Sequence, residues 1–142
     1  MYLDLERIAA ERGIKAFGQA SDMIEAGPET QLTAILDTWA PYYIKRVKAV
    51  QDGTWTSEQS WDGLKDGILS MAPYTNMPDD VKALAEETEA KIISGELKPF
   101  TGPVTLQDGT PWLAEGETAD DGTLLGLNVL VEGVDGTIPS SE

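Results

Sequence analysis

Apolar and polar positions along the first part of the chain predict a helix, a short strand and a long polar loop. Residues 3–12 have helical spacing, with charged side chains such as Glu6 on the solvated side, and Gly13 follows as a helix stop. Residues 14–17 form a short, mostly apolar run that is typical of a buried strand. The polar stretch over 18–29 then predicts a loop.

The next stretch fits two structures, and one proline decides between them. Apolar residues between positions 32 and 50 fit the spacing of one continuous helix. Pro41 argues against it, because a proline inside a helix clashes and removes a hydrogen bond, whereas it suits the first turn. The pattern therefore predicts a strand over 32–38 and a helix over 40–52. The side of this helix expected to face the sheet carries Tyr43, Val47 and Val50.

The following segment predicts a strand and a second helix. Residues 64–71 read as a strand, and residues 78–94 as a helix that ends at Gly95. The pattern predicts a buried stripe on this helix, made of Val81, Leu84, Ala85, Thr88 and Ile92. The irregular stretch between the two helices holds Trp55 and Trp61, which are costly to expose and are expected to pack on the core rather than against a partner.

The last third predicts mainly a hairpin. The pair Asp108-Gly109 is a strong turn signal inside residues 104–114. A short helical turn over 118–125 and a last strand over 127–131 are expected, and residues 136–142 are expected to fray. Together these elements predict an α/β fold in one partial domain over 1–142.

The composition excludes several classes of partner and catalytic chemistry, but it does not indicate a particular function. The 142 residues carry 10 Lys and Arg against 25 Asp and Glu, a net charge of −15, which disfavours nucleic acid and anionic membranes as partners. The absence of Cys and His excludes disulfides, thiolate and His-based catalysis, and most zinc sites. No apolar run reaches the roughly 18 residues of a membrane span, and the N-terminus reads as an amphipathic start rather than a secretory signal.

Two carboxylates fall where apolar runs end, and ligands of open α/β sheets bind at the carboxyl ends of strands. Asp22, with Ser21, either binds a ligand or caps the next turn, and the residues alone favour capping. Asp37 lies close in sequence to Trp39 and to Tyr42 or Tyr43, a combination that suits a planar polar ligand. No phosphate loop or nucleophile elbow is present, so the sequence indicates a binding protein, not an enzyme, with no cofactor or metal.

An ordered series of short motifs closely resembles the C-terminal portion of the basic-membrane-protein family of substrate-binding lipoproteins, of the PnrA type. The series covers nearly the whole chain, and its strength lies in the order. Its members are residues 16–23, 32–33, 39–46, 53–55, 63–64, 99–103 and 132–134.

The resemblance implies part of a type I periplasmic-binding-protein lobe, a parallel sheet flanked by helices with a C-terminal hairpin. It also implies the substrate-binding component of an ATP-binding-cassette importer, outside the cytoplasm, with a permease as partner and a purine nucleoside or nucleobase as solute. The ligand contacts it implies are Gln19, Ser21, Asp22, Asp37 and Trp39.

Family members also have a complete N-terminal lobe, so the resemblance implies a missing lobe or self-association as a further partner. Some nucleoside-binding relatives have a lysine at the position of Asp37. The alternative function is an acidic α/β interaction domain that assembles with a separate chain and binds no small ligand alone.

Overall fold

A computed structural model describes residues 2–138 of the chain. Within it the chain divides into two compact units, Met1–Leu97 and Lys98–Glu142, which are described separately below. That the chain forms a single partial domain stays a prediction. Most of the tail expected to fray lies outside the described residues.

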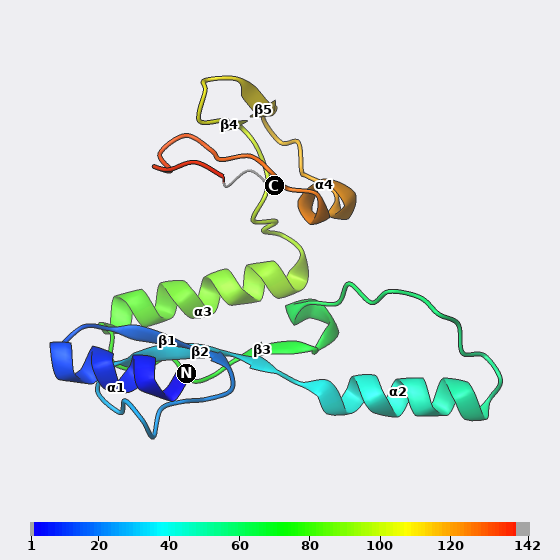
Figure 1. Ribbon diagram of the computed structural model, residues 1–142, viewed down its shortest axis with the longest axis horizontal. Coiled ribbons are helices and arrows are strands. Elements are labelled where there is room, and N and C mark those ends of the chain that lie inside the picture. The colour runs from blue at the N-terminus through cyan, green and yellow to red at the C-terminus, as the bar shows by residue number, and fades with distance from the viewer. Residues whose placement is uncertain (1, 139–142) are drawn as a thin grey trace. The chain divides into compact units, whose positions relative to one another are not determined.

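The first unit is built on a three-stranded sheet in the order β1 (Ala16–Ala20), β2 (Gln31–Asp37) and β3 (Leu69–Met71) (Figure 1). β1 and β2 are parallel, with Gly18 opposite Ala34, whereas β3 runs antiparallel to β2. The strand predicted over 32–38 is confirmed, so this stretch is not helical.

The strand predicted over 64–71 is only partly right. Its first residues form a 3₁₀ helix, η1 (Leu64–Asp66), and only β3 is extended. Gly67 separates the two elements, with a left-handed φ of 73° that a side chain would rarely adopt. The first strand also lies two residues later than predicted, over β1 rather than 14–17.

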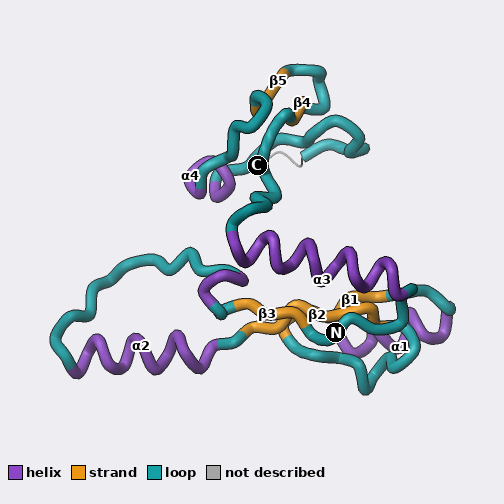
Figure 2. Tube along the Cα trace, turned by 180° about the vertical axis from the view of Figure 1, so that it is seen from behind, coloured by secondary structure: helices purple, strands orange, loops and turns teal. Residues whose placement is uncertain are grey.

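Three helices belong to this unit: α1 (Tyr2–Arg12), α2 (Trp39–Gln51) and α3 (Asp79–Ser94). Their bounds agree with the predicted helices to within two residues. Gly53 and Gly95 follow the ends of α2 and α3 with φ values of 66° and 78°, which confirms the predicted glycine stops. α1 and α3 flank the sheet, while α2 continues past the end of β2, as the two opposite views show (Figure 2).

The predicted burial of the helices is only partly right. The stripe predicted on α3 lines a hollow beside Met71 of β3, and Ala85, Thr88 and Ile92 in it are half-buried. α2 and α3 bury none of their residues, and Val47 and Leu84, both expected to face inward, are 58% and 64% exposed. Trp55 and Trp61, expected in the core, are 52% and 58% exposed. Helical periodicity identifies which face of a helix is apolar, but whether that face is buried depends on what packs against it. Several of the expected inward positions are likewise exposed, including Tyr43, Val50 and Val81.

The core of the first unit is made of small and polar side chains. Ala34 and Ala72 are fully buried, and so are the polar residues Gln31 and Thr33. The Thr33 hydroxyl donates a 2.7 Å hydrogen bond to the carbonyl of Ala72, which satisfies it inside the core. A core of this kind gains its specificity more from hydrogen bonds than from apolar area.

Glu6 departs from the solvated position predicted for it. It is 2% exposed and packs against the turn at Gly27, where its Oε2 lies 3.0 Å from the place a Cβ would take. That oxygen has no hydrogen-bond partner among the described residues. Burial raises the pKa of the Glu6 carboxyl.

The second unit confirms the predicted hairpin. β4 (Val104–Thr105) pairs antiparallel with β5 (Pro111–Leu113), and Gly109 has a φ of 85° in the turn between them. α4 (Asp121–Leu125) confirms the short helical turn, and Asp120 caps it by accepting a 2.7 Å hydrogen bond from the amide of Thr123. That bond lowers the pKa of the Asp120 carboxyl.

The last strand predicted over 127–131 is not formed. Val131 makes only an isolated bridge with Leu106, and the residues before it are irregular. The mixed α/β class is nevertheless confirmed, with a parallel strand pair flanked by helices and a C-terminal hairpin. Within residues 2–138 none of the helices has both the length and the apolar character required to cross a bilayer.

Candidate ligand-binding site

A cavity of about 300 Å³ lies beside the first turn of α2, where β2 ends. Two aromatic side chains form part of its wall, and polar side chains from the segment before η1 form another part. The lining residues are Trp39, Tyr42, Ser60, Asp62 and Ile68. Its volume is near the lower end of the range of roughly 300–1,000 Å³ for small-molecule sites.

The path of the backbone explains why these residues meet. Asp37, the last residue of β2, pairs with Leu69 at the start of β3. Next to this pair, the amide of Thr38 donates a 2.7 Å hydrogen bond to the carbonyl of Ile68. The start of α2 and the residue before β3 are therefore fixed beside each other, at the carboxyl end of a parallel strand.

The aromatic wall is an edge-to-face pair of rings. The rings of Trp39 and Tyr42 lie 6.0 Å apart between centroids, at an interplanar angle of 82°, an edge-to-face contact. Trp39 remains 50% exposed, so its ring has surface to offer a ligand. Of the two tyrosines left open by the sequence, Tyr42 lines the cavity and Tyr43 does not.

Asp22 is engaged by the protein through one oxygen. Its Oδ1 accepts hydrogen bonds from the amide of Ile24 at 3.0 Å and from Nε2 of Gln31 at 2.7 Å. The first bond is the local turn cap that the sequence favoured. The second fixes the carboxylate to a fully buried side chain. Among the described residues no hydrogen bond reaches its Oδ2, which leaves that oxygen to a ligand or to water.

The two carboxylates at the strand ends are not brought together. Gln31 Oε1 lies 3.1 Å from where a Cβ on Gly18 would stand, so the Asp22–Gln31 pair lies over Gly18, on the face that also carries Ala34. Side chains alternate between the two faces along a strand, which puts Asp37 on the opposite face from Ala34. The two side chains therefore lie on opposite faces of the sheet, and that both contact a ligand stays a prediction.

Gln19 and Ser21, the two remaining residues predicted from the sequence as ligand contacts, are both exposed. Gln19 lies in β1 opposite Ile35, and its side chain is exposed. Ser21 is exposed in the loop after β1, and its carbonyl oxygen lies 3.2 Å from where a Cβ on Gly18 would stand. Both residues lie close in sequence to Asp22, and neither lines the cavity beside Trp39.

Sequence reasoning missed Ser60, Asp62 and Ile68. Ser60 and Asp62 lie in a segment without helix or strand, where no periodicity marks an inward position. Ile68 lies inside the strand predicted over 64–71, between η1 and β3, and was not considered as a site residue. The available signal was the polar pair Ser60 and Asp62 on either side of Trp61. This pair lies just before the strand predicted over 64–71. Irregular segments held by a scaffold frequently carry binding residues.

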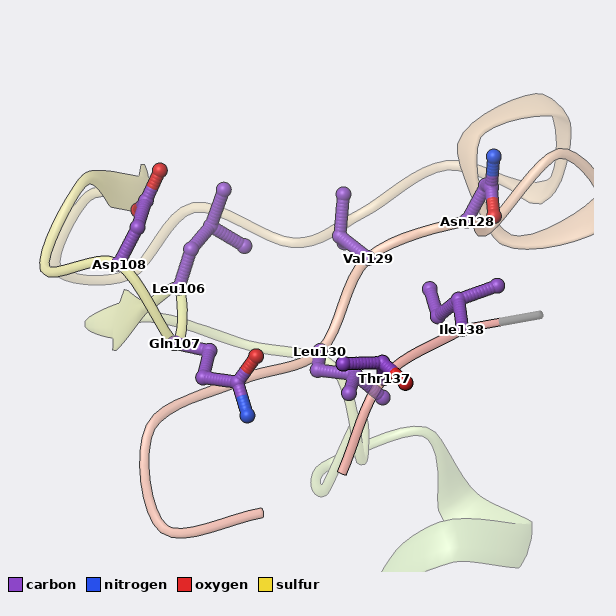
Figure 3. Close-up of a pocket in the computed structure, with 8 residues that line it drawn as sticks. All are labelled: Leu106, Gln107, Asp108, Asn128, Val129, Leu130, Thr137 and Ile138. Atoms are coloured by element: carbon purple, nitrogen blue, oxygen red, sulfur yellow. The ribbon is translucent and has the colours of Figure 1, made fainter. Parts of the chain in front are cut away.

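Two of the other hollows offer weaker chemistry. One, of about 400 Å³, lies between α3 and β3 and is mostly apolar; there the hydroxyl of Tyr74 and the carboxylate of Glu89 are 3.1 Å apart. Burial, followed by that contact, raises the pKa of Tyr74 to about 12. The other, of about 300 Å³, belongs to the second unit (Figure 3). Its amide Gln107 already donates to the carbonyl of Val134 at 2.7 Å.

The cavity beside Trp39 therefore has the best combination for a planar polar ligand. An aromatic surface can stack on a ring, while the Asp62 carboxylate and the Ser60 hydroxyl can accept hydrogen bonds from its edge. Among residues 2–138 no three potential metal ligands lie together.

Comparison with known proteins points to a homologue. The chain is 65% identical over 133 residues to a purine-binding protein of Brucella abortus (strain 2308). The match covers 94% of this chain but 38% of that protein, so the chain spans well under half the length of this curated relative. No family model matches the chain.

Two solved structures resemble the chain at low sequence identity. One is a transcriptional activator of the comK gene from Bacillus halodurans, with a TM-score of 0.59 and 21% identity over 68% of this chain and 35% of that one. This likeness concerns the fold alone. Another is an ABC-transporter solute-binding protein from Conexibacter woesei, 20% identical, with a TM-score of 0.46 over 66% of this chain and 33% of that one.

Proposed function

We propose that this chain is part of a solute-binding protein that binds a purine nucleoside or nucleobase. The observation that carries the proposal is the 65% identity to a purine-binding protein over nearly the whole chain. The cavity beside Trp39 supports it independently, because it combines an aromatic wall with a carboxylate and a hydroxyl. Purine bases present a flat π-surface and N–H donors on their edges, which such a wall can recognise.

In this proposal Trp39 stacks on the base, with Tyr42 fixing the tilt of the indole ring. Asp62 and Ser60 accept hydrogen bonds from the base edge. Asp22 acts as a second acceptor, through the oxygen that Gln31 leaves unbound. The resemblance adds Gln19, Ser21 and Asp37 as further contacts.

The wider role follows from the resemblance to the basic-membrane-protein family. We propose a component of an ATP-binding-cassette importer that works outside the cytoplasm, belongs to a lipoprotein family and delivers its solute to a permease. Its task is recognition and release, not catalysis. The name of the homologue as a binding protein supports this assignment.

Calorimetric titration tests the function. Adenine, guanine and adenosine are titrated into the protein, with uracil and cytidine as pyrimidine controls of similar polarity. Binding of at least one purine, with weaker or no binding of the pyrimidines, is the expected result. If purines and pyrimidines both give no binding heat, the proposal is wrong for this chain, and the interaction-domain alternative gains support.

Site variants then test the contacts. Asp22→Asn keeps the shape of the side chain but removes its charge, so purine affinity is expected to fall about tenfold if Asp22 bonds the ligand. Glu25→Gln, in the same exposed loop, is the matched control. Equal affinity of Asp22→Asn and the control would remove Asp22 from the site while leaving the Trp39 cavity in place.

A further inference from the structure

Arg46 joins α2 to the segment that forms the polar wall of the candidate site. Its Nη2 donates hydrogen bonds to the hydroxyl of Ser60 at 2.9 Å and to the carbonyl of Glu58 at 3.3 Å. Its guanidinium carbon lies 5.1 Å from the centre of the Tyr42 ring. One half-buried side chain therefore contacts both an aromatic and a polar member of the cavity wall.

The segment that Arg46 contacts has few other restraints. Near its start, the amide of Trp55 donates to the carbonyl of Ala49 at 3.1 Å, and past its end the amide of Gly63 donates to Asp66 at 3.0 Å. Between these points, over residues 56–62, the hydrogen bonds to the described part of the chain come from Arg46. Every residue of that stretch is exposed.

The chemistry at this position requires the shape of arginine. A planar guanidinium can lie against an aromatic ring and at the same time donate from its edge to an oxygen acceptor. A lysine ammonium is a compact point charge that cannot hold both contacts in one geometry. The neighbouring cation Lys45 has no described contact with Ser60 or Tyr42, so the two basic residues differ in role.

We propose that Arg46 is a positioning residue of the ligand site, which holds Ser60 and Asp62 against Trp39 and Tyr42. The part of this inference that concerns ligand affinity rests on the proposed function; the part that concerns the segment does not. Without Arg46 the polar wall loses its attachment to the helix that carries the aromatic wall. Ligand binding must then also order the segment, and the conformational entropy lost in doing so lowers the affinity.

The experiment compares Arg46→Met, Arg46→Lys and the control Lys45→Met. NMR order parameters of the backbone are measured for residues 56–62, together with adenine affinity and melting temperature. In both Arg46 variants the order parameters are expected to fall below about 0.6 in this segment and to stay unchanged in α1. Adenine affinity is expected to fall about fivefold in the Arg46 variants, because ordering the segment then opposes binding. Their melting temperature is expected to equal that of the wild type, and Lys45→Met is expected to match the wild type in all three properties.

Two results would overturn the inference. One is unchanged order of residues 56–62 in Arg46→Met, and the other is lost order with unchanged adenine affinity. If the wild-type protein binds no purine, the proposed function fails by itself, and the order parameters alone decide whether Arg46 positions the segment. Full recovery of both properties in Arg46→Lys would also contradict it, since charge alone would then suffice.

Discussion

Gln31 Nε2 donates a 2.7 Å hydrogen bond to Oδ1 of Asp22, and this bond ties the loop after β1 to the first residue of β2. Gln31 is 1% exposed, and its Oε1 accepts a second bond from the amide of Met23 at 3.0 Å. The buried amide of Gln31 is therefore hydrogen-bonded through both its nitrogen and its oxygen, and it fixes the orientation of the Asp22 carboxylate.

Replacing Gln31 is therefore expected to be costly. Gln31→Leu leaves the amide of Met23 and the carboxylate of Asp22 without their partner, and the free energy of unfolding should fall by about 2 kcal/mol. Gln31→Glu places a second carboxylate against Asp22, so its loss should be larger at pH 7 than at pH 4, where protonation removes the repulsion. Urea unfolding at the two pH values measures both. A loss in Gln31→Glu that is equal at both pH values would contradict the pairing.

The second prediction concerns Gly18, beneath the Asp22–Gln31 pair. A Cβ at this position would lie 2.6 Å from the Cβ of Ala34 and 3.1 Å from Oε1 of Gln31. Gly18→Ala should reduce the free energy of unfolding by about 1–2 kcal/mol, because the parallel strands must separate to admit the methyl group. Gly63→Ala, where nothing lies within 4 Å, is the control and should change it by less than about 0.5 kcal/mol. Similar effects of the two substitutions in denaturant unfolding would show that the strand contact is looser than described.

The third prediction concerns the buried carboxyl of Glu6. Since Oε2 has no partner, Glu6→Gln should raise the free energy of unfolding at pH 7 by about 1 kcal/mol. The matched control is Glu29→Gln on the exposed side of the adjacent loop.

The change in the free energy of unfolding caused by Glu6→Gln is expected to depend on pH. Burial raises the pKa of Glu6 above its ordinary value of 4.5, so the folded chain holds this proton more tightly than the unfolded chain does. Stability from this group is therefore present below pH 4.5 and is lost as the pH rises through the raised pKa. The gain from Glu6→Gln should vanish at pH 4, and a gain that persists there would contradict the assigned cause.

Local signals predicted the elements of this fold well. Pro41 correctly separated β2 from α2, and the glycines after α2 and α3 have the left-handed backbone expected of helix stops. The Asp108-Gly109 pair correctly indicated the hairpin turn. In each case the deciding constraint acts within a few residues, which is why the sequence carries it.

Contacts between distant residues were not predictable in the same way. The apolar faces of α2 and α3 were recognised, but neither helix holds a fully buried residue, because burial depends on elements that are distant in sequence. Glu6 looked solvated because its burial depends on the turn at Gly27, which is far away in sequence. For the site, Trp39 was predicted, whereas Asp62 and Ser60 reach the cavity through an irregular segment that no periodicity marks.

The most direct test of purine recognition by the aromatic wall is a calorimetric titration of adenine into the wild type, Trp39→Ala and Tyr43→Ala. Base stacking on an aromatic side chain is worth about 1–3 kcal/mol, so Trp39→Ala should bind adenine at least about fivefold more weakly. Tyr43→Ala, which removes a neighbouring ring outside the cavity, should bind within about twofold of the wild type. Equal adenine affinity in all three proteins would contradict the account.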